Sequence, residues 1–138
     1  MSAERLAGIA AEIQDMKFSY KVKKSKSPDY WKHRADEFAR YVSKATEYYT
    51  QAYHIMKQKD GHEAGMFLLY TGKFGQITSE LLDTMKKIVE NPSVMNQGRQ
   101  QSRWSREIRD HLIRYSNLCL NQEKDMNAKF RKFCQKHL

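Results

Sequence analysis

The chain has 138 residues, a net charge of +9, and a composition that is 40% hydrophobic, 12% aromatic and 30% charged. This balance is typical of a folded domain with one core, and it excludes a chain that is disordered throughout. No stretch has the roughly 18 consecutive apolar residues that span a bilayer, and the first residues do not resemble a secretory signal. We therefore expect an intracellular protein without a membrane segment.

Residues 1–26 are expected to form a short amphipathic helix followed by a Lys-rich connector. Apolar residues recur at three- and four-residue spacing over residues 6–16, and Ser2 is a candidate N-cap. Residues 17–26 then carry five Lys and no acid. Such a run is typical of a solvated linker or a nuclear-import signal, and alternatively of a contact with a polyanion such as DNA or RNA. The candidate polyanion contacts in this run are Lys21, Lys23, Lys24 and Lys26.

A long helix is predicted over residues 28–60, at the start of a single α-helical domain that covers residues 27–138. Ser27 can cap the helix, and Pro28 is preorganised for the first helical position. An apolar stripe with spacings of three and four residues continues from Trp31 to Ile55. The helix would be about 50 Å long, whereas a compact globule of this size is about 37 Å across. This difference predicts that the helix bends, or that its end packs against a second copy or another protein.

A second helix is predicted to follow a turn at Gly61 and Gly65. Its apolar stripe runs from residue 70 to residue 88 and ends before Asn91-Pro92. Gly72 and Gly75 lie inside this pattern and cost about 1 kcal/mol each relative to Ala. They indicate either a later helix start, near residue 71, or a close crossing with another helix.

The remainder of the chain is predicted to be a polar loop over residues 91–102 followed by helix. The apolar pattern supports two helices, over residues 102–120 and 122–137, or one helix bent near Asn121. No segment shows the alternation of a β-strand. The fold class is therefore all-α, an antiparallel bundle of four to five helices.

The first long helix has more aromatic residues than one buried stripe can hold. Tyr and Trp dominate the energetics of protein–protein interfaces, so some of these rings could face a partner. Alternatively, they cover neighbouring helices of the same domain. The candidate interface residues are Trp31, Tyr41, Tyr48 and Tyr53.

The sequence shows no pattern of a catalytic, metal or cofactor site. The five His residues are scattered, with no His-x-x-x-His pair and no Cys-x-x-Cys motif. Asp36 and Glu37, or Asp60 and Glu63, could come together in the fold, but both pairs are also typical of solvated helix faces. Cys119 and Cys134 lie on or near apolar stripes and are expected to be buried, reduced thiols. We therefore expect no enzymatic activity, no cofactor and no small-molecule substrate.

Positive charge is concentrated again in the last third of the chain. Residues 91–138 carry ten Lys or Arg against four Asp or Glu, whereas residues 27–90 are balanced. A basic helical surface that contacts nucleic-acid phosphates is therefore an alternative function. Its candidate contacts, besides the lysines of the connector, are Arg99, Arg103, Arg106 and Arg109.

The start of the long helix resembles a known family. The chain reads Lys32-His33-Arg34-Ala35-Asp36 and then Ser43-Lys44-Ala45, with a Tyr and Ala52 following. This pattern resembles the C-terminal homology domain of the AF4/FMR2 family of transcription-elongation scaffolds, most clearly over residues 29–56. Later segments follow the order of that domain more loosely, and the family domain continues with further helices.

The resemblance implies a helical domain similar to tetratricopeptide-type helix pairs, without enzymatic activity. It also implies a homodimer, or a heterodimer with a related chain, in a nuclear scaffold of the transcription-elongation machinery. Nucleic-acid binding by a basic surface is a further implication.

Overall fold

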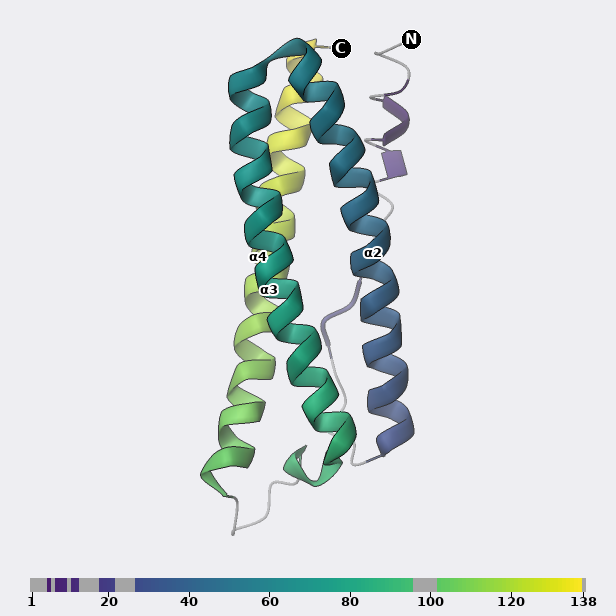
Figure 1. The fold of residues 1–138 in the computed structure, drawn as a ribbon, viewed down its shortest axis with the longest axis vertical. Helices are drawn as coiled ribbons and strands as arrows, with labels where there is room; N and C mark the ends of the chain where they lie inside the picture. The colour runs from purple at the N-terminus through teal and green to yellow at the C-terminus, as the bar shows by residue number, and fades with distance from the viewer. Residues whose placement is uncertain are drawn as a thin grey trace.

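The computed structural model describes residues 5, 7–9, 11, 12, 18–21, 27–95 and 102–137. Within these residues all regular structure is helical, as the sequence predicts (Figure 1). Three long helices run side by side: α2 (Pro28–Lys59), α3 (Gly61–Glu90) and α4 (Arg103–His137). A short 3-10 helix, η1 (Pro92–Met95), follows α3, and the described residues between 5 and 12 are also helical. The long helices form an up-down-up bundle in which α3 packs against both α2 and α4.

Helix α2 begins where the sequence signals predict. The Ser27 side-chain oxygen accepts a hydrogen bond from the backbone N–H of Tyr30 at 3.4 Å, and Pro28 occupies the first turn. The helix ends at Lys59, where the backbone N–H of Asp60 donates to the carbonyl of Met56. The prediction of a helix over residues 28–60 is therefore confirmed to within one residue.

The predicted turn over Gly61 to Gly65 is wrong, because the chain reverses at Asp60 alone. The Asp60 carboxylate accepts hydrogen bonds from the backbone N–H groups of His62 and Glu63, at 3.1 and 3.2 Å. This N-cap satisfies two free donors of α3, so the helix can start at Gly61.

Gly72 and Gly75 lie in the interior of α3, so the alternative of a helix start near residue 71 is wrong. A Cβ atom built at either glycine would meet no atom of the described residues within 4 Å, apart from the neighbouring backbone of α3 itself. The alternative of a close crossing is therefore not realised by any helix among the described residues.

The end of the chain forms one helix rather than two. Helix α4 continues through Asn121, which is exposed, while the next residues, Gln122 and Glu123, are buried with the apolar stripe. A single Asn on the solvent side is only mildly unfavourable in a helix and does not end one. The polar loop prediction is also wrong in part, because Val94 and Met95 of η1 are buried; residues 96–101 lie outside the described residues.

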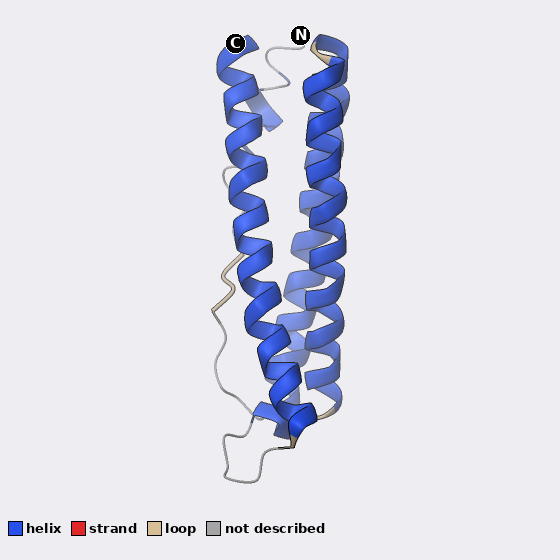
Figure 2. Ribbon diagram, turned by 90° about the vertical axis from the view of Figure 1, so that its left-hand side faces the viewer, coloured by secondary structure: helices blue, strands red, loops and turns tan. Residues whose placement is uncertain are grey.

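The three long helices have 32, 30 and 35 residues, so they are similar in length. Each therefore spans the bundle from end to end, and the molecule is elongated (Figure 2). The expectation that α2 overhangs a compact globule is wrong, because α3 and α4 accompany it along its length.

The buried side chains form two clusters along this axis. The first cluster lies toward the turn between α2 and α3 and consists of Ile9, Ala45, Tyr49, Ala52, Ile55, Met56, Ala64, Phe67, Phe74, Met126, Phe130, Phe133 and Cys134. The second cluster lies toward η1 and consists of Trp31, Ala35, Phe38, Ile77, Leu81, Met85, Ile88, Val94, Met95, Ile108, Leu112 and Cys119. Tyr41 packs against both clusters and lies at their junction.

The two tryptophans provide a test of this core. Trp31 is 0% exposed, whereas Trp104 is 49% exposed. We expect Trp31→Ala to lower the free energy of unfolding by about 3–5 kcal/mol, because a large ring leaves a cavity. Trp104→Ala is the matched control and should change it by less than about 1 kcal/mol. Urea unfolding followed by circular dichroism measures both, and similar losses for the two variants would contradict the packing.

Candidate interaction surfaces

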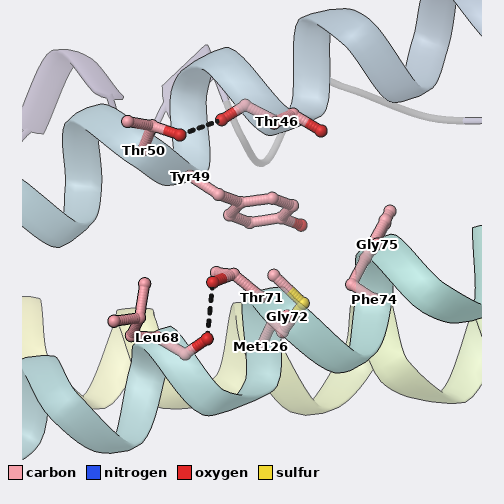
Figure 3. A pocket seen from close by; sticks show the side chains of 9 residues that line it. All are labelled: Thr46, Tyr49, Thr50, Leu68, Thr71, Gly72, Phe74, Gly75 and Met126. Atoms are coloured by element: carbon pink, nitrogen blue, oxygen red, sulfur yellow. Dashed lines mark hydrogen bonds between the residues drawn. The ribbon is translucent and has the colours of Figure 1, made fainter.

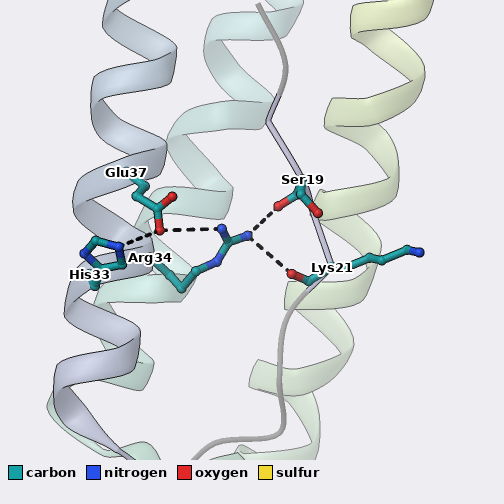
Figure 4. Close-up of polar contacts among 5 residues, drawn as sticks. All are labelled: Ser19, Lys21, His33, Arg34 and Glu37. Atoms are coloured by element: carbon teal, nitrogen blue, oxygen red, sulfur yellow. Dashed lines mark hydrogen bonds and ion pairs between the residues drawn. The ribbon is translucent and has the colours of Figure 1, made fainter.

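Residues 18–21, which we call the strap, lie between α2 and α4 (Figure 4), because Arg34 of α2 and Glu123 of α4 both form hydrogen bonds with this segment. The Phe18 ring packs on Phe38 and Tyr41, with ring centroids 5.0 and 5.5 Å apart, and the Tyr20 ring packs on Phe18. The expectation that residues 17–26 are a solvated connector is therefore wrong for the strap. The strap packs against the bundle because its two aromatic residues, Phe18 and Tyr20, bury apolar surface, which lysines cannot do.

Arg34 of α2 holds the backbone of the strap (Figure 4). Its guanidinium donates to the carbonyl oxygen of Ser19 at 2.5 Å and to that of Lys21 at 3.5 Å. The same group lies over the Phe18 ring, 4.6 Å from its centroid, and pairs with Glu37 at 3.7 Å. These contacts explain how a charged side chain can be buried in the bundle.

On the α4 side of the strap, Glu123 is the hydrogen-bond acceptor. Its carboxylate accepts hydrogen bonds from the hydroxyl groups of Tyr20, at 2.5 Å, and of Tyr41. Burial raises the pKa of Glu123, and the two hydrogen bonds oppose that rise in part. Burial together with the charge of Glu123 also raises the pKa of the Cys119 thiol to about 12, so this buried cysteine is protonated, as a packed, inert thiol should be.

The four candidate interface residues of α2 are therefore placed differently from one another. Trp31 is fully buried, so its assignment to an interface is wrong: the ring fills the second core cluster. Tyr41 donates to Glu123 within the chain. Tyr48 donates to Glu12 at 3.3 Å, and Tyr53 is half-buried and packs against the first cluster. For Tyr41 and Tyr48, the alternative in which the rings cover neighbouring elements of the same chain describes the structure better.

The largest exposed apolar residues lie instead on α3 and α4. On α3, Met66, Leu68 and Leu69 are exposed, Leu69 by 69%. Uncharged residues continue along this outer side of the helix at helical spacing, and all are exposed. We call this set the α3 face: Gly61, Gly65, Leu68, Leu69, Gly72, Gly75, Gln76 and Ser79.

A hollow of about 260 Å³ lies beside the α3 face, between α2 and α3 (Figure 3). The backbone of Gly72 and Gly75 forms part of its wall, since these residues have no side chains to cover it. The ring of Tyr49 reaches from α2 toward α3 and closes its inner side (Figure 3). The full lining is Thr46, Tyr49, Thr50, Leu68, Thr71, Gly72, Phe74, Gly75 and Met126.

A second apolar region lies on α4 next to the strap. Ile113 is 62% exposed. Ile113 and Leu120 line one side of a hollow of about 390 Å³, and the strap also lines it. This region is separate from the α3 face.

The candidate polyanion contacts are only partly described. Lys23, Lys24, Lys26 and Arg99 lie outside the described residues. Lys21 is exposed at the end of the strap. Arg103 and Arg106 are exposed at the start of α4, with Arg103 paired to Glu107 at 3.0 Å, and Arg109 is half-buried. Helix α4 as a whole carries nine Lys or Arg against four Asp or Glu.

One group in the described part of the chain combines a histidine with carboxylates closely enough to hold a metal ion. It consists of Asp60, Glu63 and His137, whose ligand atoms all lie within 4.8 Å of one another. The sequence spacing could not indicate it, because His137 is far from the other two in the chain. No helix in the described ranges is long and apolar enough to cross a bilayer.

No family model, no curated protein and no solved structure matches this chain. The resemblance to the AF4/FMR2 domain therefore rests on the residues of the sequence.

The buried Glu123 predicts a pH dependence of stability. Because its pKa is higher in the folded protein than the ordinary value of 4.5, the folded state binds this proton more tightly. The carboxyl's contribution to the free energy of unfolding is therefore greatest below pH 4.5 and falls as the pH rises through the folded-state pKa. Glu123→Gln keeps an oxygen acceptor for the tyrosines and should remove this decline, measured by thermal unfolding between pH 4 and about 8. If Glu123→Gln leaves the pH profile of stability unchanged, the prediction is contradicted. Asp125→Asn, at an exposed position of the same helix, is the control and should keep the wild-type profile.

Proposed function

We propose that this chain is a non-enzymatic protein-interaction module that forms a homodimer, or a heterodimer with a related chain, in a nuclear transcription-elongation scaffold. The resemblance of residues 29–56 to the AF4/FMR2 domain supports the class of protein and its nuclear location. The α3 face supports association, and it is the observation that carries the proposal: an exposed, uncharged helix face in a chain that is 30% charged.

The glycines of α3 favour a helix as the partner. In a helix interior, each Gly costs about 1 kcal/mol relative to Ala. The structure leaves room for a Cβ atom at Gly65, Gly72 and Gly75, so packing among the described residues does not require glycine there. Exposed backbone without side chains does allow a second helix to approach closely, which would explain why glycine occupies these positions.

A second copy of α3 is complementary to the first. If two α3 helices pack antiparallel about a two-fold axis at Gly72, Leu69 of each copy falls opposite Gly75 of the other. The most exposed apolar side chain of α3 then enters the hollow that the glycines leave open. An isologous contact of this kind uses the same patch on both copies, as in most homodimers.

Leu69→Asp tests the dimer. Placing a charge at the centre of the α3 face should shift the chain to monomer, with at least about a tenfold weaker association, because the carboxylate would lose its hydration in the contact. Light scattering at micromolar concentration measures the change. Ile113→Asp is the matched control on α4 and should leave the dimer intact.

A second variant tests the hollow. Gly75→Leu fills it and raises helix propensity, so the chain should fold and yet associate more weakly. A wild-type chain that is strictly monomeric would refute the dimer, and a dimer broken by Ile113→Asp but not by Leu69→Asp would move the interface to α4.

Nucleic-acid binding is a second candidate, favoured by the basic excess of α4. We propose that its exposed cations contact phosphates, with Arg106 central because Arg103 is already paired with Glu107. The logarithm of the affinity for an oligonucleotide should then fall linearly with the logarithm of salt concentration, with a slope of a few units.

A fluorescence-anisotropy titration with a labelled oligonucleotide measures this slope. Arg106→Gln should reduce it by about one unit, because one phosphate contact is lost. Arg103→Gln is the control, since its guanidinium is held by a carboxylate. No binding at low salt would exclude this function.

A further inference from the structure

The C-terminal end of α4 lies beside the turn between α2 and α3 (Figure 1). This neighbourhood brings His137 to Asp60, which ends α2 and caps α3, and to Glu63 in the first turn of α3. We propose that these three residues form a binding site for a divalent transition-metal ion of the zinc class.

The donor set is suited to such an ion. One imidazole nitrogen and two carboxylate oxygens are common zinc ligands, at metal–ligand distances of about 2.0–2.2 Å. Ligand atoms around a tetrahedral ion at those distances are about 3.3 Å apart. The structure places the three ligand atoms within 4.8 Å of one another, so the side chains must rotate to reach that spacing. Three protein ligands leave the fourth position for water.

The carboxylates are prepared for a cation. One oxygen of Asp60, Oδ1, accepts the two backbone hydrogen bonds of the N-cap, whereas Oδ2 takes no part in them and lies 4.0 Å from the Lys136 ammonium. The helix cap therefore fixes one ligand in place.

His137 provides an independent observation. Its Nε2 atom is buried and has no hydrogen-bond partner among the residues that the structure describes. The Phe133 ring packs against the imidazole, with centroids 4.4 Å apart, and limits how the ring can turn. An unpaired buried nitrogen is costly, and coordination of a metal ion would satisfy the imidazole.

Lys136 is the resident competitor for this site. Its ammonium lies 3.6 Å from Glu63 Oε1 and 4.0 Å from Asp60 Oδ2, where it neutralises part of the acidic charge. The Lys136 side chain is 61% exposed, so it can move into solvent when a divalent ion arrives. Removing this lysine should therefore tighten metal binding, whereas a purely structural ion pair would only be lost.

Titration of the untagged chain with Zn²⁺, by calorimetry, and with Co²⁺, by visible absorption, tests the site. We expect one ion per chain and a higher thermal midpoint when the ion is bound, because it joins α4 to the turn between α2 and α3. His137→Ala and Glu63→Gln should each weaken binding at least about tenfold, since each removes one of three ligands. Lys136→Met should strengthen binding several-fold.

The exposed pair of His33 and Glu37, 3.1 Å apart, provides the matched control. His33→Ala should leave the affinity unchanged, which separates this site from weak surface chelation. No binding up to millimolar Zn²⁺, or binding that survives His137→Ala, would overturn the proposal. Weaker binding in Lys136→Met would overturn the competitor role and with it the arrangement of ligands described here.

Discussion

The carboxylate of Glu123 is the interaction on which the arrangement of this bundle depends. A buried carboxylate is costly unless it accepts hydrogen bonds, and its two donors come from different parts of the chain, the strap and α2. Helices α2 and α4 each pack more closely on α3 than on one another. The polar contacts to Glu123 therefore fix the width of the space between α2 and α4, and a second hydroxyl bond, from Tyr49 to Asn127 at 2.8 Å, repeats the link farther along.

The strap, which precedes α2 in the chain, occupies part of the same space between α2 and α4. Phe18 and Tyr20 fill this space with aromatic surface, and Arg34 donates hydrogen bonds to the backbone carbonyls of Ser19 and Lys21. Four residues that are not helical thus pack beside the second core cluster. Their contacts require a buried arginine and a buried glutamate, each with specific partners.

The sequence predicts the long helices well because their apolar residues recur at the period of an α-helix. The stripe from Trp31 to Ile55 and the signals at Ser27 and Pro28 locate α2 to within one residue. The errors occur where local and tertiary effects compete. Two glycines suggest a turn at 61–65, but the Asp60 side chain caps a helix there, and the five lysines of the connector hide the two aromatic residues that bury the strap.

The candidate surfaces were harder to predict, since an amino-acid type does not reveal which side of a helix it occupies in the bundle. Trp31 resembles an interface residue in the sequence but lies in the core. The α3 face did leave a signal: Gly61, Gly65, Leu69, Gly72, Gln76 and Ser79 follow each other at spacings of four, four, three, four and three without a charge. The group of Asp60, Glu63 and His137 left none, because only the antiparallel packing of α3 and α4 brings its members together.

The division of the core into two clusters has a consequence for how the molecule opens. The clusters occupy opposite halves of the same three helices, and among the described residues Tyr41 packs on both. Local unfolding of one half then leaves the apolar contacts of the other half intact, as in a chain of cooperative units joined in series. A partner that binds one end can therefore unfold that end locally while the cluster at the opposite end keeps the three helices packed.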